Sequence, residues 1–340
     1  AIISIIDEKN IEEIGVISSK FADLLIKSSL QFSMFQYYKD NSEFFYKEID
    51  ITKSGFFLIA LGKLGSNDLN YSSDIDLLFF FDNERINNYL NKNPGYHLNL
   101  IIKKFINILS TVNEFDFVYR TDFRLRPDPG MTPLAISTIA AENYYFGLGQ
   151  NWERAALIRS RYICGDKKSF NFFFSIIKRF IWRPTLDFFA IDDIKSIKNQ
   201  IDVTQKTNFK SLQDYNIKIG RGGIREIEFY VHILQLIWGG KYLNLQSNNL
   251  IESINSLCSN NLISKKIKNI LINNYFILRN LENRIQMLEN NQNHSMPKNK
   301  EIYNKLIIFC GFSIKREFEI YYIDILRSTR SIFKDLFKED

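Results

Sequence analysis

The sequence predicts an α+β protein in which a small sheet in the first half of the chain is followed by an all-α second half. Two short apolar runs, residues 56–61 and 75–81, are typical of strands that are buried on both faces. Alternating residue types over residues 115–126 indicate a third strand with one polar face. After residue 167 the apolar residues recur at helical spacings, and few strand signals remain.

Length and composition indicate a globular protein of two or three domains. The chain has 340 residues, of which 45% are hydrophobic and 24% charged, so a disordered chain is excluded. We expect an N-terminal bracing helix in residues 1–50, a sheet-bearing domain in residues 51–165 and a helical domain in residues 166–340. The first residue is Ala1 rather than Met, which suggests a fragment of a longer protein.

Localisation is predicted from what the sequence lacks. No apolar run approaches the ~18–20 residues of a membrane span, and no signal peptide is visible. The cysteines, Cys164, Cys258 and Cys310, have neither zinc nor redox spacing, so we expect free thiols and a cytoplasmic protein. Lys and Arg outnumber Asp and Glu by 44 to 38, an excess that suits a phosphate-bearing ligand but does not require one.

Residues 1–46 are predicted to be helical because apolar residues recur at spacings of three and four. We interpret this helix as a brace for the domain that follows, without a functional role of its own. Its expected apolar side consists of Ile11, Ile14, Ile17, Phe21, Leu24 and Leu25.

Residues 55–82 are the most informative stretch, with a strand, a glycine-bearing turn and a second strand that opens with two acids. Gly65 and Ser66 lie in the turn, where glycine lets backbone N–H groups approach an anion. Asp74 and Asp76 share one strand face at a spacing of roughly 7 Å, because residues i and i+2 point the same way. Two neighbouring carboxylates repel each other, and a divalent cation such as Mg²⁺ relieves that repulsion.

A loop and a helix are predicted between the second strand and the third. Residues 83–95 are polar and are predicted to form a loop broken by Pro94 and Gly95. Residues 97–113 are predicted to form an amphipathic helix. Over residues 115–126 the polar face holds Asp122 with Arg124 and Arg126, as well as Asp116 and Arg120. This face either holds a metal–phosphate complex or is a solvated, salt-bridged surface; the acids at 74 and 76 favour the first.

Helices are predicted over residues 137–147, with Ser137 or Thr138 as the cap, and over residues 151–163. The second carries Arg159 and Arg161, which either line a phosphate site or are solvated. Gly165-Asp166 marks the expected domain boundary.

In the second half, Gly220 to Gly223 precede a predicted helix with an apolar stripe. Glu228 falls on that stripe, which suggests that it faces a polar cleft, and Glu226 lies beside it; an ion pair with an arginine explains Glu228 equally well. Residues 262–290 are predicted to form a long helix of bundle core, without a chemical role.

A glycine-bearing turn, an Asp-x-Asp pair that opens a strand and a third Asp on a later strand form the layout of two-metal nucleotidyltransferase sites. Displacement at phosphorus is helped by two cations ~3.5–4 Å apart, and three carboxylates can hold both. Little proton transfer is required of the protein, which agrees with the scattered positions of His97, His232 and His294.

Motifs along nearly the whole chain resemble the glutamine synthetase adenylyltransferase family. They include LGKLGSNDLNYSSDIDLLF, YRTDFRLRPDPGMTPL, NWERAALIRSR, KIGRGGIREIEF and YFILRNLENRIQMLENNQNHSMP. The resemblance implies a polymerase β-like nucleotidyltransferase domain with a small mixed sheet, followed by an all-α helical bundle. It further implies a bifunctional enzyme, of which this chain resembles the N-terminal half. That half removes AMP from a tyrosine of glutamine synthetase by phosphorolysis and gives ADP, and a PII signalling protein sets the balance with adenylylation from ATP.

By motif position, the resemblance implies that Asp74, Asp76 and Asp122 bind two Mg²⁺ ions. It assigns Gly65, Ser66, Arg124 and Arg126 to nucleotide and phosphate binding, and Glu226 and Glu228 to the cleft wall. The chain departs from the family at Asn67, where an Arg is usual, and near Asn283, where His is frequent. Adenylyl transfer from ATP and a non-catalytic binding module remain as alternatives. Nucleic acid is not expected as a partner, because no aromatic residues interleaved with Lys and Arg are evident.

Overall fold

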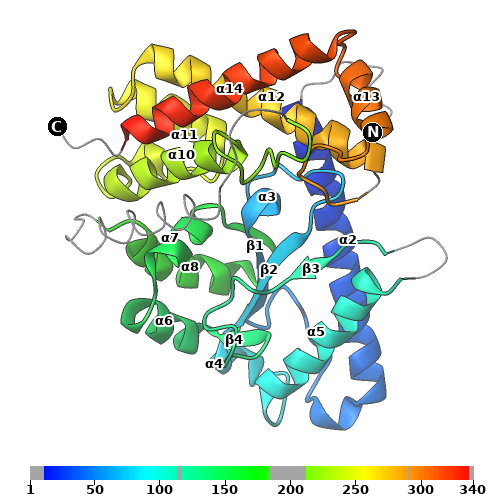
Figure 1. Ribbon diagram of the computed structural model, residues 1–340. Coiled ribbons are helices and arrows are strands. Elements are labelled where there is room, and N and C mark those ends of the chain that lie inside the picture. The colour runs from blue at the N-terminus through cyan, green and yellow to red at the C-terminus, as the bar shows by residue number, and fades with distance from the viewer. Residues whose placement is uncertain (1–10, 113–116, 184–211, 290, 337–340) are drawn as a thin grey trace. The chain divides into compact units, whose positions relative to one another are not determined.

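The computed structural model describes residues 11–112, 117–183, 212–289 and 291–336. It divides into two compact units (Figure 1). The sheet unit comprises Ile14–Leu69 and Ser73–Arg183, and the helical unit comprises Ala1–Glu13, Asn70–Ser72 and Pro184–Asp340. The predicted α+β class is confirmed. Within the described ranges no helix has a stretch that is both long and apolar enough to cross a membrane.

The sheet unit contains a small mixed sheet with the order β3-β2-β1-β5, and β4 also pairs with β2. β1 is antiparallel to β2 and β5, whereas β3 and β4 run parallel to β2. The strands are β1 (Phe56–Ala60), β2 (Ile75–Phe81), β3 (Thr121–Asp122), β4 (Ala135–Ser137) and β5 (Arg161–Gly165). The helices are α2 (Ile11–Asp40), η1 (Ser42–Phe44), α3 (Gly62–Gly65), α4 (Asn83–Ile86), α5 (Pro94–Ser110), α6 (Thr138–Gly147), α7 (Asn151–Ile158) and α8 (Lys167–Ile181).

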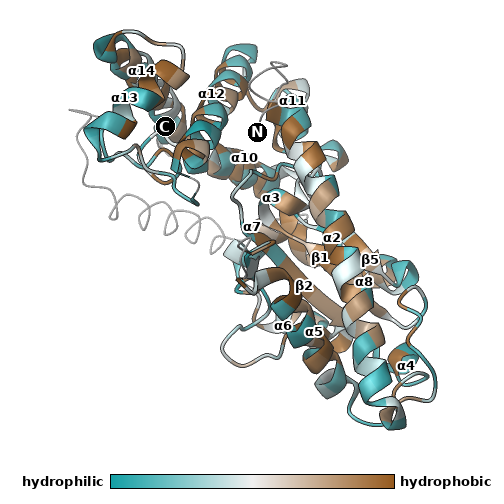
Figure 2. Cartoon of the chain, turned by 90° about the vertical axis from the view of Figure 1, so that its right-hand side faces the viewer, coloured by the Kyte–Doolittle hydropathy of each residue, from teal (hydrophilic) through white to brown (hydrophobic). Residues whose placement is uncertain are grey.

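The sheet is covered on both faces, as the two apolar runs predicted. Phe79 of β2 contacts Phe105 of α5 and shares a core with buried residues of α2. On the opposite face Phe80 packs against Phe173 of α8 (Figure 1). The central strands are accordingly apolar except at Asp76, the second residue of β2 (Figure 2).

The helical unit packs its helices around one apolar core, which includes Ile227, Leu278 and Leu326. Its elements are α10 (Ile224–Trp238), η2 (Leu243–Leu245), α11 (Leu250–Ser259), α12 (Lys265–Glu289), α13 (Lys300–Phe309) and α14 (Lys315–Asp335). The helix predicted over residues 224–238 is confirmed as α10, and the helix predicted over residues 262–290 is present as α12, which begins only at Lys265; residue 290 lies outside the described residues. However, α12 is not purely apolar on its inner side, because Arg279 and Glu282 are fully buried.

The apolar side predicted for the N-terminal helix is wrong in part. Ile17, Phe21 and Leu24 are 53%, 57% and 61% exposed. The helix turns a different stripe to the core, formed by Ala22, Ile26, Leu30, Met34 and Tyr37. The prediction failed because apolar residues occur on two sides of α2, and spacing alone does not tell which side meets the sheet.

The predicted loop at residues 83–95 is also corrected, since it contains α4. Asp82 caps α4 by accepting hydrogen bonds from Glu84 N and Arg85 N. Pro94 does not break structure but begins α5, because the fixed φ of proline suits the first helical position.

The strand predicted over residues 115–126 is much shorter in the structure. Residues 113–116 lie outside the described residues, and only Thr121–Asp122 form β3. The Asp122 carboxylate accepts the backbone N–H of Arg124, which turns the chain. Arg126 then donates to the carbonyl oxygens of Phe123, Pro129 and Thr132 and holds the segment as a loop.

The helix predicted over residues 151–163 ends at Ile158 and is followed by β5, which pairs with β1. Arg161, at the start of β5, donates two hydrogen bonds to Asp23 of α2, at 2.7 and 3.0 Å. The charge of Arg161 is therefore neutralised inside the fold. The arginine belongs to a strand and not, as predicted, to a helix. The Ser137 cap of α6 is confirmed, because its hydroxyl accepts the N–H of Ala140.

Asp166 ties α8 to the sheet, so the sheet unit extends beyond the expected boundary at residue 165. Its fully buried carboxylate caps α8 through Lys168 N and Ser169 N and accepts Gly55 N at 3.0 Å. It also pairs with Arg85 at 2.7 Å. The side chain thus joins the beginning of α8 to the beginning of β1.

Replacing Asp166 by alanine is expected to destabilise the chain by about 3 kcal/mol. The change removes a helix cap and leaves the Gly55 N–H without its acceptor, and each loss costs roughly 1–2 kcal/mol. Urea unfolding measures the difference. Asp50→Ala is the control, because the half-exposed Asp50 pairs with Thr52 and Lys53, its neighbours in sequence. Equal stability of the two variants would contradict this role of Asp166.

Candidate active site

The three predicted acids lie at the edge of the sheet where β2 and β3 begin. β2 and β3 are parallel, and Asp76 lies directly opposite Asp122 in their register. Neighbouring strands are about 4.8 Å apart, so these two residues are adjacent. Asp74 precedes Asp76 by two residues, and the N–H of Ile75 between them is bonded to Arg120 O at 2.9 Å.

Two of the acids are paired with arginines of the same segment. Arg120 Nε donates to Asp74 Oδ1 at 2.6 Å, and Arg124 Nη2 lies 2.5 Å from Asp122 Oδ2. The Arg124 side chain is 84% exposed, whereas that of Asp122 is 13% exposed. An exposed guanidinium is weakly held in such a pair, so an anionic ligand can compete for it.

The carboxylate of Asp76 is directed toward the turn that follows β1. A β-carbon placed on Gly62 would lie 2.5 Å from Asp76 Oδ2, and Gly62 has a φ of +57°. Glycine is therefore favoured here, because a β-carbon would displace the Asp76 carboxylate and few other residues adopt this backbone conformation. The turn itself is the short helix α3 rather than an open loop.

The charges at this edge are coupled. Burial alone would raise the pKa of Asp122, but hydrogen bonds from the side chain and the backbone of Arg124 hold it below its ordinary value. The pKa of Arg124 is raised, first by the hydrogen bond to Asp122 and its charge, and further by the charges of Asp76 and Asp74. The charges of all three carboxylates thus favour the charged form of Arg124, although its guanidinium is paired with Asp122.

The donor chemistry suits a hard divalent cation, because Asp76 and Asp122 lie opposite each other on neighbouring strands and Asp74 directly precedes β2. In the arrangement seen, however, no three Asp, Glu, His or Cys side chains converge into a metal centre anywhere in the described ranges. Arg120 and Arg124 instead occupy the carboxylates of Asp74 and Asp122. The residue types therefore fit a metal ion. A bound ion would have to displace the two arginine side chains from these carboxylates.

Gly65 and Ser66 lie at the end of α3 and are both buried. A β-carbon on Gly65 would lie 1.8 Å from Arg159 O, so glycine is needed there for close backbone packing. Ser66 Oγ accepts a hydrogen bond from Arg159 Nε at 2.6 Å. The half-exposed residues of this turn are Gly62 and Lys63, one turn earlier.

The remaining predicted residues belong to other segments of the chain. Arg126 is bonded to three backbone carbonyls of its own loop. Glu226 and Glu228 belong to the helical unit. There Glu226, rather than Glu228, is fully buried, and it accepts hydrogen bonds from Gly222 N and Arg330 Nη1. Glu228 is half-buried.

Sequence reasoning placed Gly62 in the turn and Arg120 on the polar face, but it foresaw neither the approach of Gly62 to Asp76 nor the pairing of Arg120 with Asp74, and it left Arg159 open. Arg159 is 8% exposed and donates a hydrogen bond to Ser66, so it neither lines the surface nor is solvated. Gly62 directly follows an apolar strand, and a glycine at that position is a signal of a tight turn that can be recognised in the sequence. Arg120 lies two residues before Asp122, but its pairing with Asp74 depends on the β2–β3 register.

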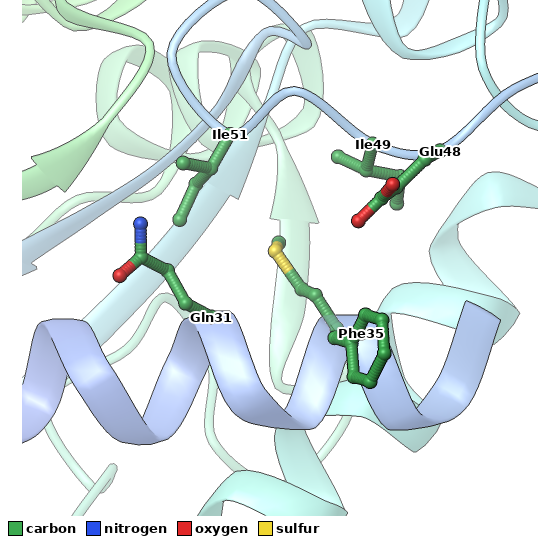
Figure 3. A pocket seen from close by; sticks show the side chains of 6 residues that line it. Gln31, Phe35, Glu48, Ile49 and Ile51 are labelled. Carbon is green, nitrogen blue, oxygen red and sulfur yellow. The ribbon is translucent and has the colours of Figure 1, made fainter. Parts of the chain in front are cut away.

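A separate cavity of about 260 Å³ lies between α2 and the segment before β1 (Figure 3). It is lined by Gln31, Met34, Phe35, Glu48, Ile49 and Ile51. None of these residues belongs to the acidic edge, and the lining offers one carboxylate and one amide for chemistry.

Comparison with known proteins gives two family matches. Residues 1–173 match the model of the glutamate-ammonia ligase adenylyltransferase family, and residues 195–337 match that of GlnD PII-uridylyltransferase. Curated relatives are named bifunctional glutamine synthetase adenylyltransferase/adenylyl-removing enzyme. The protein of Bartonella quintana is 38% identical over 84% of this chain and 30% of its own length. That of Brucella melitensis is 36% identical over 84% and 29%, and that of Mesorhizobium japonicum 38% over 76% and 26%. The chain thus spans about 30% of the length of these relatives.

Proposed function

The chain belongs to the glutamate-ammonia ligase adenylyltransferase family, and from that premise we propose that it removes AMP from an adenylylated tyrosine of glutamine synthetase by phosphorolysis. The observation that carries the proposal is the placement of Asp76 opposite Asp122, with Asp74 beside them, at one edge of the sheet. The relatives are named for both adenylylation and its removal. The motifs KIGRGGIREIEF and DFRLRP resemble the N-terminal, adenylyl-removing half, which favours removal.

The proposed reaction conserves its atoms in a single displacement. An oxygen of inorganic phosphate forms a bond to the α-phosphorus of the AMP group, and the bond from that phosphorus to the tyrosine oxygen breaks. The products are ADP and the free tyrosine, whose phenolate oxygen takes up a proton. No covalent intermediate with the protein is needed.

We assign the acids to cation binding. Asp74, Asp76 and Asp122 would hold Mg²⁺, with two ions expected, and bound Mg²⁺ would neutralise charge on the reacting phosphate oxygens. Gly62 leaves room for the Asp76 carboxylate. Arg124, released from Asp122, can contact phosphate oxygens through its exposed guanidinium. Arg126 supports the reaction by fixing the loop that follows.

The proposed partners are adenylylated glutamine synthetase, phosphate, ADP and ATP, in the cytoplasm. The match of residues 195–337 to GlnD PII-uridylyltransferase supports a helical unit that responds to a PII signalling protein. Adenylyl transfer from ATP onto glutamine synthetase is the second candidate, because the relatives' names include it.

A paired assay distinguishes these candidates. One tube contains the 340-residue chain, adenylylated glutamine synthetase, Mg²⁺ and phosphate; the other contains unmodified synthetase and ATP. We expect phosphate-dependent ADP in the first tube and no labelled synthetase in the second. Labelled synthetase alone would support transfer, and no product in either tube would support a module that only binds.

A further inference from the structure

The turn between β1 and β2 contacts Asp76 at its beginning. The N–H of Leu61 donates to Asp76 O at 2.9 Å, and Gly62 lies against the Asp76 carboxylate, where a β-carbon would be 2.5 Å from Oδ2. All of these residues belong to the sheet unit. A displacement of the turn therefore changes the space in which the Asp76 side chain lies.

An arginine of β5 holds the other end of this turn. Arg161, the first residue of β5, donates from Nη2 to Leu64 O at 3.0 Å. The same carbonyl oxygen accepts the N–H of Asn67 at 3.2 Å, and its two lone pairs allow both bonds. Because α3 has four residues, it contains few hydrogen bonds of its own, so a donor from outside stabilises it.

The guanidinium of Arg161 is itself fixed by α2. Its Nη1 lies 2.7 Å from Asp23 Oδ2 and its Nη2 lies 3.0 Å from Asp23 Oδ1, so the pair is bidentate. The side chains of Arg161 and Asp23 are 21% and 27% exposed. Partial burial and two-point contact make the pair firmer than an exposed ion pair. Through it, the bracing helix has a specific contact with the turn.

Arg159 lies close to the same turn but holds a different group. It donates to the side chain of Ser66, at 2.6 Å from Oγ, whereas Arg161 donates to the backbone at Leu64. Loss of the contact at Leu64 therefore acts directly on the path of the main chain. Both arginines belong to the sheet unit, as does the turn.

We propose that Arg161 is a positioning residue for Asp76 and that it acts through the backbone of the turn. The contacts run from Asp23 through Arg161 to Leu64 O, and the turn then carries the constraint back to Gly62, against the carboxylate. Arg161 touches no reacting atom of the proposed reaction. The effect on ADP release rests on the proposed function, whereas the effect on the turn does not.

The variant Arg161→Lys separates positioning from general stability. Lysine keeps the charge and can pair with Asp23, but one ammonium group does not reproduce the fork that reaches Asp23 and Leu64 O together. The sheet unit should therefore fold, which circular dichroism and the thermal unfolding midpoint check. Arg179→Lys is the matched control, because Arg179 is an exposed arginine in the last turn of α8.

The variant Asp23→Asn tests the other side of the contact. Asparagine keeps the size of the side chain but removes its charge and one acceptor oxygen, so Arg161 is held less firmly. We expect the turn to loosen here as well. The effect should be smaller than in Arg161→Lys, because the bond from Arg161 to Leu64 O can persist.

Three readouts are expected to change in Arg161→Lys. Without Mg²⁺, amide exchange at residues 65–68, whose N–H groups are bonded within the turn, should become about 10-fold faster, while exchange in α5 and α8 stays as in the parent chain. Mg²⁺ affinity, measured by calorimetry, should fall about 5-fold, and kcat for ADP release about 10- to 100-fold. The KM for phosphate should change little, because positioning acts on the transition state.

The outcomes distinguish positioning from a purely structural role. Parent-like exchange at residues 65–68 in folded Arg161→Lys would overturn the proposal, as would faster exchange with unchanged Mg²⁺ affinity. Exchange that rises equally in α5, in α8 and in the turn, with a lower unfolding midpoint, would mean that Arg161 only stabilises the unit. If the parent chain releases no ADP, the proposed function fails, while exchange and Mg²⁺ affinity still decide the role of Arg161.

Discussion

Asp76→Asn is expected to lower phosphate-dependent ADP release by at least about 1000-fold, which corresponds to about 4 kcal/mol of transition-state stabilisation. Asp76 is opposite Asp122 and is the acid for which Gly62 leaves space. Asparagine keeps the shape of the side chain but removes the charge that attracts a cation. Because the side chain is half-exposed, the fold should be retained.

The assay measures initial rates of ADP release at saturating phosphate, with circular dichroism and a thermal midpoint as folding checks. Asp40→Asn serves as the matched control, since Asp40 is an exposed acid of the same unit that pairs with Lys104. Asp74→Asn and Asp122→Asn should resemble Asp76→Asn. ADP release at the parent rate by a folded Asp76→Asn protein would remove these acids from the mechanism.

Glu226→Ala is expected to destabilise the helical unit by about 3–5 kcal/mol. The Glu226 carboxylate is 1% exposed and lies 2.6 Å from Arg330 Nη1 of α14. It also accepts the Gly222 N–H at 2.9 Å, in the turn that begins α10. Alanine would leave the Arg330 guanidinium buried without this partner, and it would release the turn.

Urea unfolding followed by tryptophan fluorescence and by circular dichroism measures this loss. Glu301→Ala is the control, because Glu301 and Lys305 form an exposed pair on α13 whose removal should have little effect on stability. A Glu226→Ala protein as stable as Glu301→Ala would show that the ion pair is dispensable. Glu226 would then be open to the role in a cleft wall that the family resemblance implies.

The sheet could be predicted where burial is simple. Strands β1 and β2 were recognisable because both faces are covered, with Phe79 against α5 and Phe80 against α8. The alternating pattern at residues 115–126 led to a wrong prediction of a long strand. Part of this segment is instead a loop, in which Arg126 donates to a backbone carbonyl. Strand β5 was missed because the charge of Arg161 is neutralised by Asp23, 138 residues earlier in the chain.

The candidate site shows the same division. The acids were found because Asp74 and Asp76 are close in sequence and sit where an apolar run begins. Gly62 and Arg159 gain their roles only from contacts across the fold, with Asp76 and Ser66. The polar cluster around Glu282 was read as bundle core, because helical spacing does not reveal which polar residues meet inside.

The most direct test follows the phosphorus atom of the attacking phosphate. The 340-residue chain is incubated with adenylylated glutamine synthetase, Mg²⁺ and [³²P]phosphate, and the nucleotides are separated. The account predicts label in ADP, at the β-position, in an amount equal to the AMP lost from the synthetase. Release of unlabelled AMP would mean hydrolysis rather than phosphorolysis, and retention of all AMP on the synthetase would contradict an adenylyl-removing function.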